Sequence, residues 1–362
     1  MRLGTCLALE LACVASVVGG VWVGVGNAVE LADDYVGTRE ASAATASTPY
    51  GAITRIPAAQ LTLSPPPPPP TVFDAPDDAL LGPLGAAPVT RVKPNKGGTS
   101  LSLRLDFANG ARAAFKPQQI HLQSEPRREI AAYRIDRLLG IGHVAPAKPA
   151  KFTVAELVAA ADPALRTVTT QRILTETRAK GGEVRGFIAW WIPEIRDARI
   201  GEFNVDTVEG MAVWTSYLRV GAKVPEQSRS LVEQLAALVV FDVVIDNADR
   251  WSGSNVKVSP DRKTVYFMDN TLSFSQFTKG HDNNLRPLYR MQVFPRALVA
   301  RLRALTLETL TTVLDLGDDP AGMGPLLTEG ELAAVMSRRD HVLAYVDRLI
   351  AQFGETAVLA LP

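Results

Sequence analysis

The residues best suited to chemistry lie between residues 241 and 274. An apolar run leads into a polar segment with Asp249, Arg250 and Asn255, and a second apolar run ends at Asp269. Two carboxylates at the ends of buried elements repel each other unless a cation lies between them. Mg²⁺ or Mn²⁺ bound by oxygen ligands, usually together with a phosphate, resolves this repulsion. The pattern predicts a phosphoryl-transfer site in which one Asp orients the nucleophile and the other, with an Asn, binds metal.

The composition excludes several other kinds of site. Lys and Arg number 38 and Asp and Glu number 38, so no global charge indicates nucleic acid or an anionic membrane as a partner. Cys6 and Cys13 are the two cysteines, which leaves the rest of the chain without a disulfide, a Cys-based zinc site or a thiol nucleophile. The four histidines are scattered without the spacing of metal ligands, so a His-based zinc site is not expected.

A predicted β-hairpin positions the first basic residue of interest. Residues 101–107 alternate apolar and polar side chains, and Asn109-Gly110 separates them from a second strand that runs to Lys116. Asn-Gly between two strand patterns is a strong hairpin signal. The hairpin places Lys116 at the end of a strand.

A predicted helix follows the hairpin and carries an acidic residue. Ser124 is the expected N-cap and Pro126 lies in the first turn, while Gly140 ends the helix. Glu129 lies near the helix start, beside the apolar stripe that packs on the rest of the protein.

The next segment is predicted to be a short helical insertion at residues 151–170, followed by strands at 172–177 and 183–192. The second strand ends in Trp190-Trp191. An aromatic strand end suits a nucleotide-base pocket, and core packing is the alternative for these side chains.

After residue 192 the pattern becomes mainly helical, and this gives the fold class. The strongest helical pattern covers residues 228–245, and from Leu238 to Ile245 it is apolar on all sides apart from Asp242. Charged groups are rarely buried without a partner, so we expect Asp242 to be a paired structural carboxylate. Strands first and helices later predict an α+β fold with two unequal lobes and a cleft between them. The other predicted helices cover residues 208–220, 295–305, 307–314 and 328–353.

The N-terminal part predicts export and a spacer. Residues 1–28 contain an apolar stretch over 3–25 and small residues at 26 and 28, as in a signal peptide, although Glu10 interrupts the stretch. An uncleaved membrane anchor through residues 3–25 is the alternative. Residues 29–88 are rich in Pro and Ala and predict a disordered linker. We expect the protein in the periplasm, at the cell surface or secreted.

Four motifs in series resemble the Golgi casein kinase/Four-jointed family of secretory-pathway kinases. The resemblance covers about residues 100–305 in the family's order. It implies an atypical two-lobed protein-kinase-like fold over residues 89–362, with an N-lobe at about 89–195 and a C-lobe at about 196–362. The motifs are Phe115-Lys116-Pro117, the segment from Glu129 to Gly140 followed by Val144-Ala145-Pro146, the segment from Phe241 to Arg250, and Met268-Asp269-Asn270.

The resemblance also implies roles for individual residues. Lys116 would hold the α- and β-phosphates of ATP, and Glu129 would pair with Lys116 and position it. Asp249 would orient and deprotonate the acceptor hydroxyl, and Arg250 would support the catalytic loop electrostatically. Asp269 would bind the metal ion, Mg²⁺ or Mn²⁺, that bridges the phosphates.

Two further assignments come from the residues themselves. Asn255 is a candidate second metal ligand, although it stands one residue later than in ordinary protein kinases. Trp191 is a candidate for the nucleotide-base pocket. Trp251 replaces the family's usual His and Thr271 its usual Gly, and the chain lacks the disulfides of animal members, which indicates a distant, bacterial relative.

The leading hypothesis is an exported, ATP- and metal-dependent kinase that phosphorylates a hydroxyl of protein Ser/Thr or of a glycan. It has no nucleic-acid partner, and it meets a membrane only through the alternative N-terminal anchor. Two other classes stay open, since a fold alone does not choose among them. One is a nucleotide-binding pseudokinase that acts as a scaffold or activator, and the other is a lipid or small-molecule kinase.

Overall fold

The computed structural model describes residues 71–95, 97–252 and 255–362. These described residues belong to one compact unit. The predicted signal peptide or anchor at 1–28 and most of the predicted linker lie outside the described residues. Within the described ranges, no helix combines the length and the apolar character needed to cross a bilayer.

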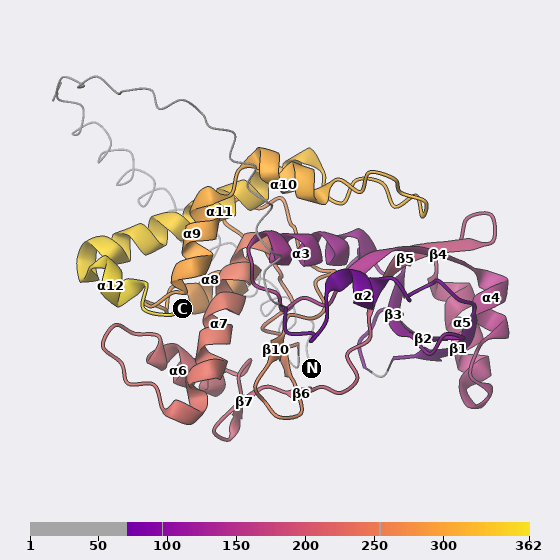
Figure 1. Cartoon of the computed structure of the whole chain (residues 1–362), viewed down its shortest axis with the longest axis horizontal. Coiled ribbons are helices and arrows are strands. Elements are labelled where there is room, and N and C mark those ends of the chain that lie inside the picture. Colours follow the sequence, from indigo (N-terminus) through magenta and orange to yellow (C-terminus); the bar gives the residue numbers. More distant parts are fainter. Residues whose placement is uncertain (1–70, 96, 253–254) are drawn as a thin grey trace, which may run out of the picture. The chain divides into compact units, whose positions relative to one another are not determined.

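The first half of this unit is built on a five-stranded antiparallel sheet in the order β1-β2-β3-β5-β4 (Figure 1). The predicted hairpin is present: Leu103 pairs with Phe115 across β2 and β3, and Gly110 takes a positive φ of 84° in the turn. The strands are β1 (Val89–Pro94), β2 (Leu103–Phe107), β3 (Arg112–Pro117), β4 (Ala147–Thr153) and β5 (Glu183–Trp190).

One predicted strand in this half is wrong. Residues 172–177 lie mostly in helix α5 (Arg166–Glu176), where Thr169 and Ile173 face the core and Arg172 pairs with Glu176 one turn later. This spacing of four residues suits a helix. Besides β3, strand β5 pairs with β4, which the sequence analysis did not predict and whose last three residues fall inside the predicted helical insertion. The rest of that insertion forms α4 (Val154–Ala159) and a short 3₁₀ helix (Pro163–Leu165) before α5.

The folded part begins before the predicted linker ends at residue 88. Helix α2 (Asp77–Leu81) lies in that stretch, and Arg137 Nε donates to Asp77 Oδ2 at 2.8 Å. Phe73 is buried, with its ring 5.6 Å from that of Trp190 and 6.0 Å from that of Tyr266. The Phe73 ring and the ion pair of Asp77 with Arg137 therefore attach this Pro- and Ala-rich segment to the rest of the unit.

The second half is helical and surrounds α7 (Glu226–Ile245), which is buried on all sides from Leu238 to Ile245. The other helices are α6 (Val208–Tyr217), α8 (Asp282–Leu288), α9 (Arg296–Ala304), α10 (Leu307–Leu314), α11 (Glu329–Phe353) and α12 (Glu355–Val358). Two small sheets accompany them, formed by β6 (Arg196–Asp197), β9 (Lys257–Val258) and β10 (Val265–Tyr266), and by β7 (Arg199–Ile200) and β8 (Phe203–Asn204).

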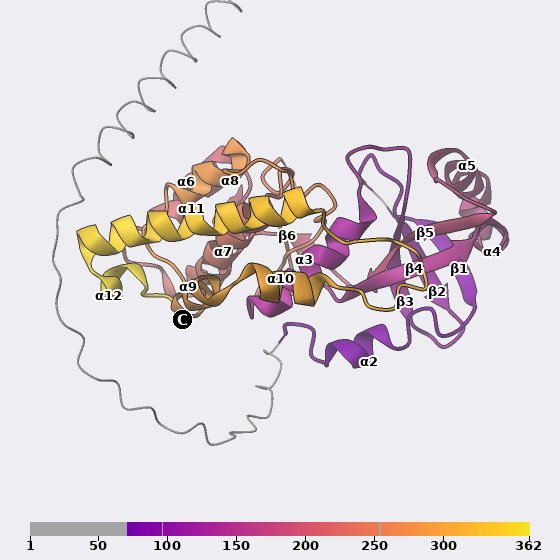
Figure 2. The same ribbon diagram turned by 90° about the horizontal axis from the view of Figure 1, so that it is seen from above.

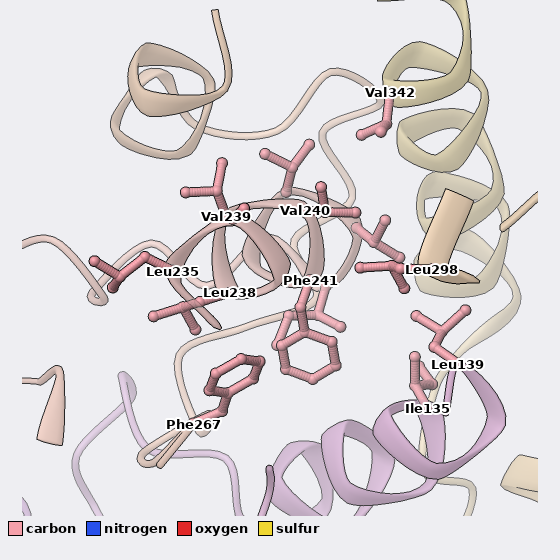
Figure 3. Packing of buried hydrophobic residues seen from close by; sticks show 14 of the residues in the cluster. Ile135, Leu139, Leu235, Leu238, Val239, Val240, Phe241, Phe267, Leu298 and Val342 are labelled. Carbon is pink, nitrogen blue, oxygen red and sulfur yellow. The ribbon is translucent and has the colours of Figure 1, made fainter. Parts of the chain in front are cut away.

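Helix α3 (Pro126–Leu138) joins the two halves. It precedes two strands of the large sheet in sequence, yet its residue Ile135 and the C-cap Leu139 pack in the same core as Phe241 of α7 and Phe267 (Figure 3). The predicted cap is wrong, because Glu125 occupies the N-cap position without a side-chain cap bond. Ser124 instead accepts a hydrogen bond from Gln119 Nε2 at 3.2 Å.

The core packing makes a stability prediction. Phe241 is 0% exposed, so Phe241→Ala leaves a cavity between α7 and α3, and we expect the free energy of unfolding to fall by about 3–5 kcal/mol. Val208, which is 74% exposed on α6, is the control, and Val208→Ala should change it by less than about 0.5 kcal/mol. Urea unfolding measures both, and equal losses for the two variants would contradict this packing.

Candidate active site

The centre of the site is an ion pair between the sheet and the helical half. Lys116, the penultimate residue of β3, places Nζ 2.8 Å from Asp269 Oδ1 and 3.0 Å from Thr271 Oγ1. The Thr271 hydroxyl also donates to Asp269 Oδ1 at 2.9 Å. The Lys116 side chain is only 8% exposed, whereas that of Asp269 is 49% exposed. A buried cation therefore meets a carboxylate that still faces solvent.

The backbone at Asp269 has an uncommon conformation. Its φ is 53°, in the left-handed region that costs a non-glycine residue about 1 kcal/mol or more. Desolvation acts to raise the pKa of Asp269, but the ammonium of Lys116 and the Thr271 hydroxyl outweigh it and keep this pKa below its usual value. The side chain is thus held as a carboxylate at the end of the second apolar run.

Glu129 lies in the same site but not in the predicted pair. Among the described residues, Lys116 forms no ion pair with Glu129; the Glu129 carboxylate instead accepts from the Asn270 backbone N–H at 2.6 Å and from Asn270 Nδ2 at 3.0 Å. Burial and the nearby Asp269 raise the pKa of Glu129, and the bonds from Asn270 and the charge of Lys116 oppose this. Glu129 therefore positions the residue that follows Asp269.

Arg250 is fully buried and connects the two polar segments. Its Nε bonds to Asp242 Oδ2 at 3.0 Å, and both side chains are 0% exposed. Its Nη2 donates to Asn270 Oδ1 at 2.7 Å, and its Nη1 donates to the carbonyl oxygens of Met268 and Asn255. The prediction that Asp242 is a paired structural carboxylate is confirmed, and Arg250 is the partner that its sequence position did not reveal.

Asp249 is held by the loop around it. Asn255 Nδ2 donates to Asp249 Oδ2 at 3.0 Å and to its carbonyl oxygen at 2.8 Å, and the Ser252 hydroxyl donates to Asp249 Oδ1. Asn247, which is fully buried, accepts from the Asp249 backbone N–H at 3.2 Å and donates to the Asp269 carbonyl oxygen at 3.1 Å. The loops of Asp249 and Asp269 are therefore tied to each other through Asn247.

The sequence analysis did not identify Asn247 and gave Asn270 no role of its own. Both are amides at the ends of apolar runs, and a buried amide needs several hydrogen-bond partners. That rule could have assigned them to a polar network between the two loops. Asn255, predicted as a metal ligand, here orients Asp249 with its amide nitrogen, and its role toward a metal stays a prediction.

The two tryptophans of interest lie in different surroundings. Trp251, which replaces the family's His, is buried and stacks on Trp214 with ring centroids 5.7 Å apart. Trp191 follows the end of β5 and is half-buried, with the Arg104 guanidinium 5.6 Å from its ring centroid. Its place in a nucleotide-base pocket stays a prediction.

The oxygen ligands available in the site fit a divalent cation whose coordination is completed by a substrate phosphate. The described residues contain no group of three or more His, Cys, Asp or Glu side chains that could hold a metal by themselves. They do offer the half-exposed Asp269 carboxylate and the amide oxygen of Asn255, whose amide nitrogen bonds to Asp249. Mg²⁺ is commonly bound by one or two carboxylates, with water and substrate phosphates as its other ligands.

The fold and this site define a class of protein. Lys116 at the end of a strand bonds to Asp269, and Asp249 lies in the loop between the buried helix α7 and Asp269. This is the arrangement of a two-lobed kinase-like site. Residues 209–358 match the family model described as "Fam20C: Golgi casein kinase, C-terminal, Fam20". The resemblance to the Golgi casein kinase family that the motifs indicate is thereby confirmed.

Known proteins extend this similarity to both halves of the described chain. The glycosaminoglycan xylosylkinase of Homo sapiens is 24% identical in an alignment 312 positions long that covers 72% of this chain and 72% of that protein. The Homo sapiens extracellular serine/threonine protein kinase FAM20C is 22% identical in an alignment 331 positions long that covers 78% of this chain and 56% of that protein.

Solved structures confirm the predicted α+β kinase-like fold. A crystal structure of the Golgi casein kinase aligns with a TM-score of 0.63 at 19% identity, over 80% of this chain and 79% of that one. The same kinase with Mn/ADP bound aligns with a TM-score of 0.61 at 19% identity, over 78% of each chain.

The buried Arg250–Asp242 pair makes a second stability prediction. Asp242→Asn leaves the guanidinium uncompensated in the core, and we expect the free energy of unfolding to fall by about 3–5 kcal/mol. The matched control is Asp347→Asn in the pair Arg303–Asp347, whose side chains are 43% and 53% exposed and whose loss should cost at most about 1 kcal/mol. Chemical denaturation compares the two variants, and a loss for Asp242→Asn no larger than that of the control would contradict the structural role.

Proposed function

We propose that this protein transfers the γ-phosphoryl group of ATP to a hydroxyl of a protein or a glycan, with Mg²⁺ or Mn²⁺ as cofactor. The observation that carries the proposal is the contact of Lys116 with Asp269, because it brings a phosphate-binding cation and a metal-binding carboxylate together from the two halves. The similarity to proteins named as kinases supports the same reaction.

Each residue has a physical task in this reaction. When nucleotide is bound, the Lys116 ammonium neutralises phosphate charge, and Asp269 with Asn255 supplies oxygen ligands for the metal. Asp249 accepts the proton of the acceptor hydroxyl, and the bonds from Asn255 and Ser252 fix the direction in which its carboxylate points. The bound metal ion supplies charge neutralisation at the transferring phosphoryl group.

Removal of the proposed base tests the reaction. The purified chain should transfer labelled phosphate from ATP only when Mg²⁺ or Mn²⁺ is present, and EDTA should abolish the transfer. Asp249→Ala should lower the rate by at least roughly a hundredfold, because general-base catalysis contributes 10²–10⁴. Asp347→Asn is the folded control and should keep the wild-type rate. A nucleotide-induced thermal shift without turnover in the wild type would favour the pseudokinase hypothesis instead.

The class of acceptor is decided by a parallel assay. A protein extract, a glycan panel that includes xylose-containing oligosaccharides and a lipid panel would each receive labelled ATP and the wild-type chain. Transfer to protein or glycan agrees with the proposal, and transfer to lipid alone contradicts it.

We also propose export, with residues 1–28 as a cleaved signal peptide or an anchor. The apolar stretch over residues 3–25 and the word "extracellular" in the name of one relative support this. Cell fractionation of the full chain should place it outside the cytoplasm, and removal of residues 1–28 should retain it there. Identical distributions of the two forms would contradict the proposal.

A further inference from the structure

Helix α3 carries Glu129, and its outer side is bonded to a distant part of the chain. Arg127 and Arg128, the two residues before Glu129, both donate to the carboxylate of Glu331 in the first turn of α11. Arg127 does so with two bonds, at 2.8 and 2.9 Å, and Arg128 with one at 3.0 Å. A carboxylate bonded to both ends of a guanidinium is a geometrically specific, charge-assisted contact.

Glu331 is itself held in place. Its side chain is 4% exposed, and its Oε2 accepts the backbone N–H of Thr328 at 2.8 Å in a capping box at the start of α11. Burial acts to raise the pKa of Glu331, but Arg127, the Thr328 backbone and Arg128 lower it to about 2. The carboxylate therefore remains charged at neutral pH and anchors α3 on the longest helix of the C-terminal half.

The segment between α10 and α11, residues 315–328, adds further attachments on the same side. Arg127 donates to the Leu326 carbonyl oxygen at 2.6 Å, and Arg134 donates to the Asp315 carbonyl oxygen at 2.5 Å. Arg185 of β5 donates to the Gly322 carbonyl oxygen at 3.0 Å. Figure 2 shows this segment running from α10 past α3 and over β4 before it reaches α11.

On its inner side, the same turn of α3 is bonded to the site. Glu129 accepts both donors of Asn270, and the Glu125 backbone N–H donates to the Thr271 carbonyl oxygen at 3.3 Å. Asn270 and Thr271 directly follow Asp269, and Thr271 contacts Lys116. A displacement of α3 would thus move the residues that fix Asp269.

We infer that Glu331 is a positioning residue for the phosphoryl-transfer site. Through Arg127 and Arg128 it holds Glu129 against Asn270, and so keeps Asp269 in the conformation that binds metal and nucleotide. Because the arginines adjoin Glu129 in sequence, the first turn of α3 is fixed on both sides in this chain. The inference rests on the proposed function for its effect on nucleotide, but the coupling from Glu331 to Asn270 is independent of turnover.

The test uses the exchange of one backbone amide with solvent. The Asn270 N–H donates to Glu129, so its hydrogen exchange reports directly on that contact. In the full chain, Glu331→Gln removes the charge and keeps the shape, and we expect the Asn270 amide to exchange roughly tenfold faster, as for loss of a charge-assisted hydrogen bond. The Mn²⁺ concentration that half-saturates ADP binding should rise, by roughly tenfold at most.

The matched control is Glu176→Gln in α5. Glu176 also forms a two-bond pair with an arginine, Arg172, at 2.6 and 2.9 Å, but within a helix of the sheet half. This variant should leave the Asn270 exchange rate and the Mn²⁺ midpoint unchanged. Arg127→Lys keeps the charge and loses the two-bond geometry. The Asn270 amide of this variant should exchange faster than in the wild type, by less than about tenfold, and the variant replaces Glu331→Gln if that protein does not fold.

The outcomes separate the inference from the proposed function. Faster Asn270 exchange in Glu331→Gln and Arg127→Lys, but not in the control, supports the positioning role. Unchanged Asn270 exchange in both folded variants overturns it, even if their thermal stability falls, because Glu331 is then only structural. A wild-type chain that transfers no phosphate contradicts the proposed function, and the exchange rates still decide the positioning role.

Discussion

The buried charge of Arg250 is the constraint on which the site depends. A guanidinium without solvent contact is tolerated only when its donors are satisfied, and here the partners come from α7, from the Asp249 loop and from the segment around Asp269. The partners of Arg250 come from separate parts of the chain. Asp242 precedes the loop that carries Arg250, and Asn270 follows the second apolar run, so the two can bond to the same guanidinium only when the two loops lie side by side.

This network joins two loops of the helical half, and the sheet half contributes Lys116 to the site. Lys116 reaches Asp269 because β3 ends beside the segment that Arg250 and Asn247 hold. Helix α3 stabilises the arrangement, since its apolar side belongs to the core of the helical half while its Glu129 bonds to Asn270. The site therefore joins residues more than a hundred positions apart in sequence through hydrogen bonds and one ion pair.

The sequence predicted those features that depend on local patterns. The hairpin around Gly110, the apolar α7 and the pairing of Asp242 follow from alternation, turn residues and the cost of a buried charge. The strand predicted at 172–177 was wrong because Thr169 and Ile173 face the core at helical spacing. Strand β4 was missed because Lys148 and Pro149 interrupt its alternation of buried and exposed residues. Glu129 bonds to Asn270 rather than to Lys116. This choice of partner depends on distances in the folded protein, which the spacing of residues along the chain does not reveal.

The central claim is that Lys116 and Asp269 form one site for nucleotide and metal. Calorimetric titration of ADP into the wild-type chain, Lys116→Met and Asp269→Ala, each with and without Mn²⁺, tests it most directly. The account predicts that the wild type binds ADP tightly only with Mn²⁺, that Asp269→Ala loses this metal dependence, and that Lys116→Met binds weakly in either condition. Equal ADP affinity in all three proteins, independent of Mn²⁺, would contradict it.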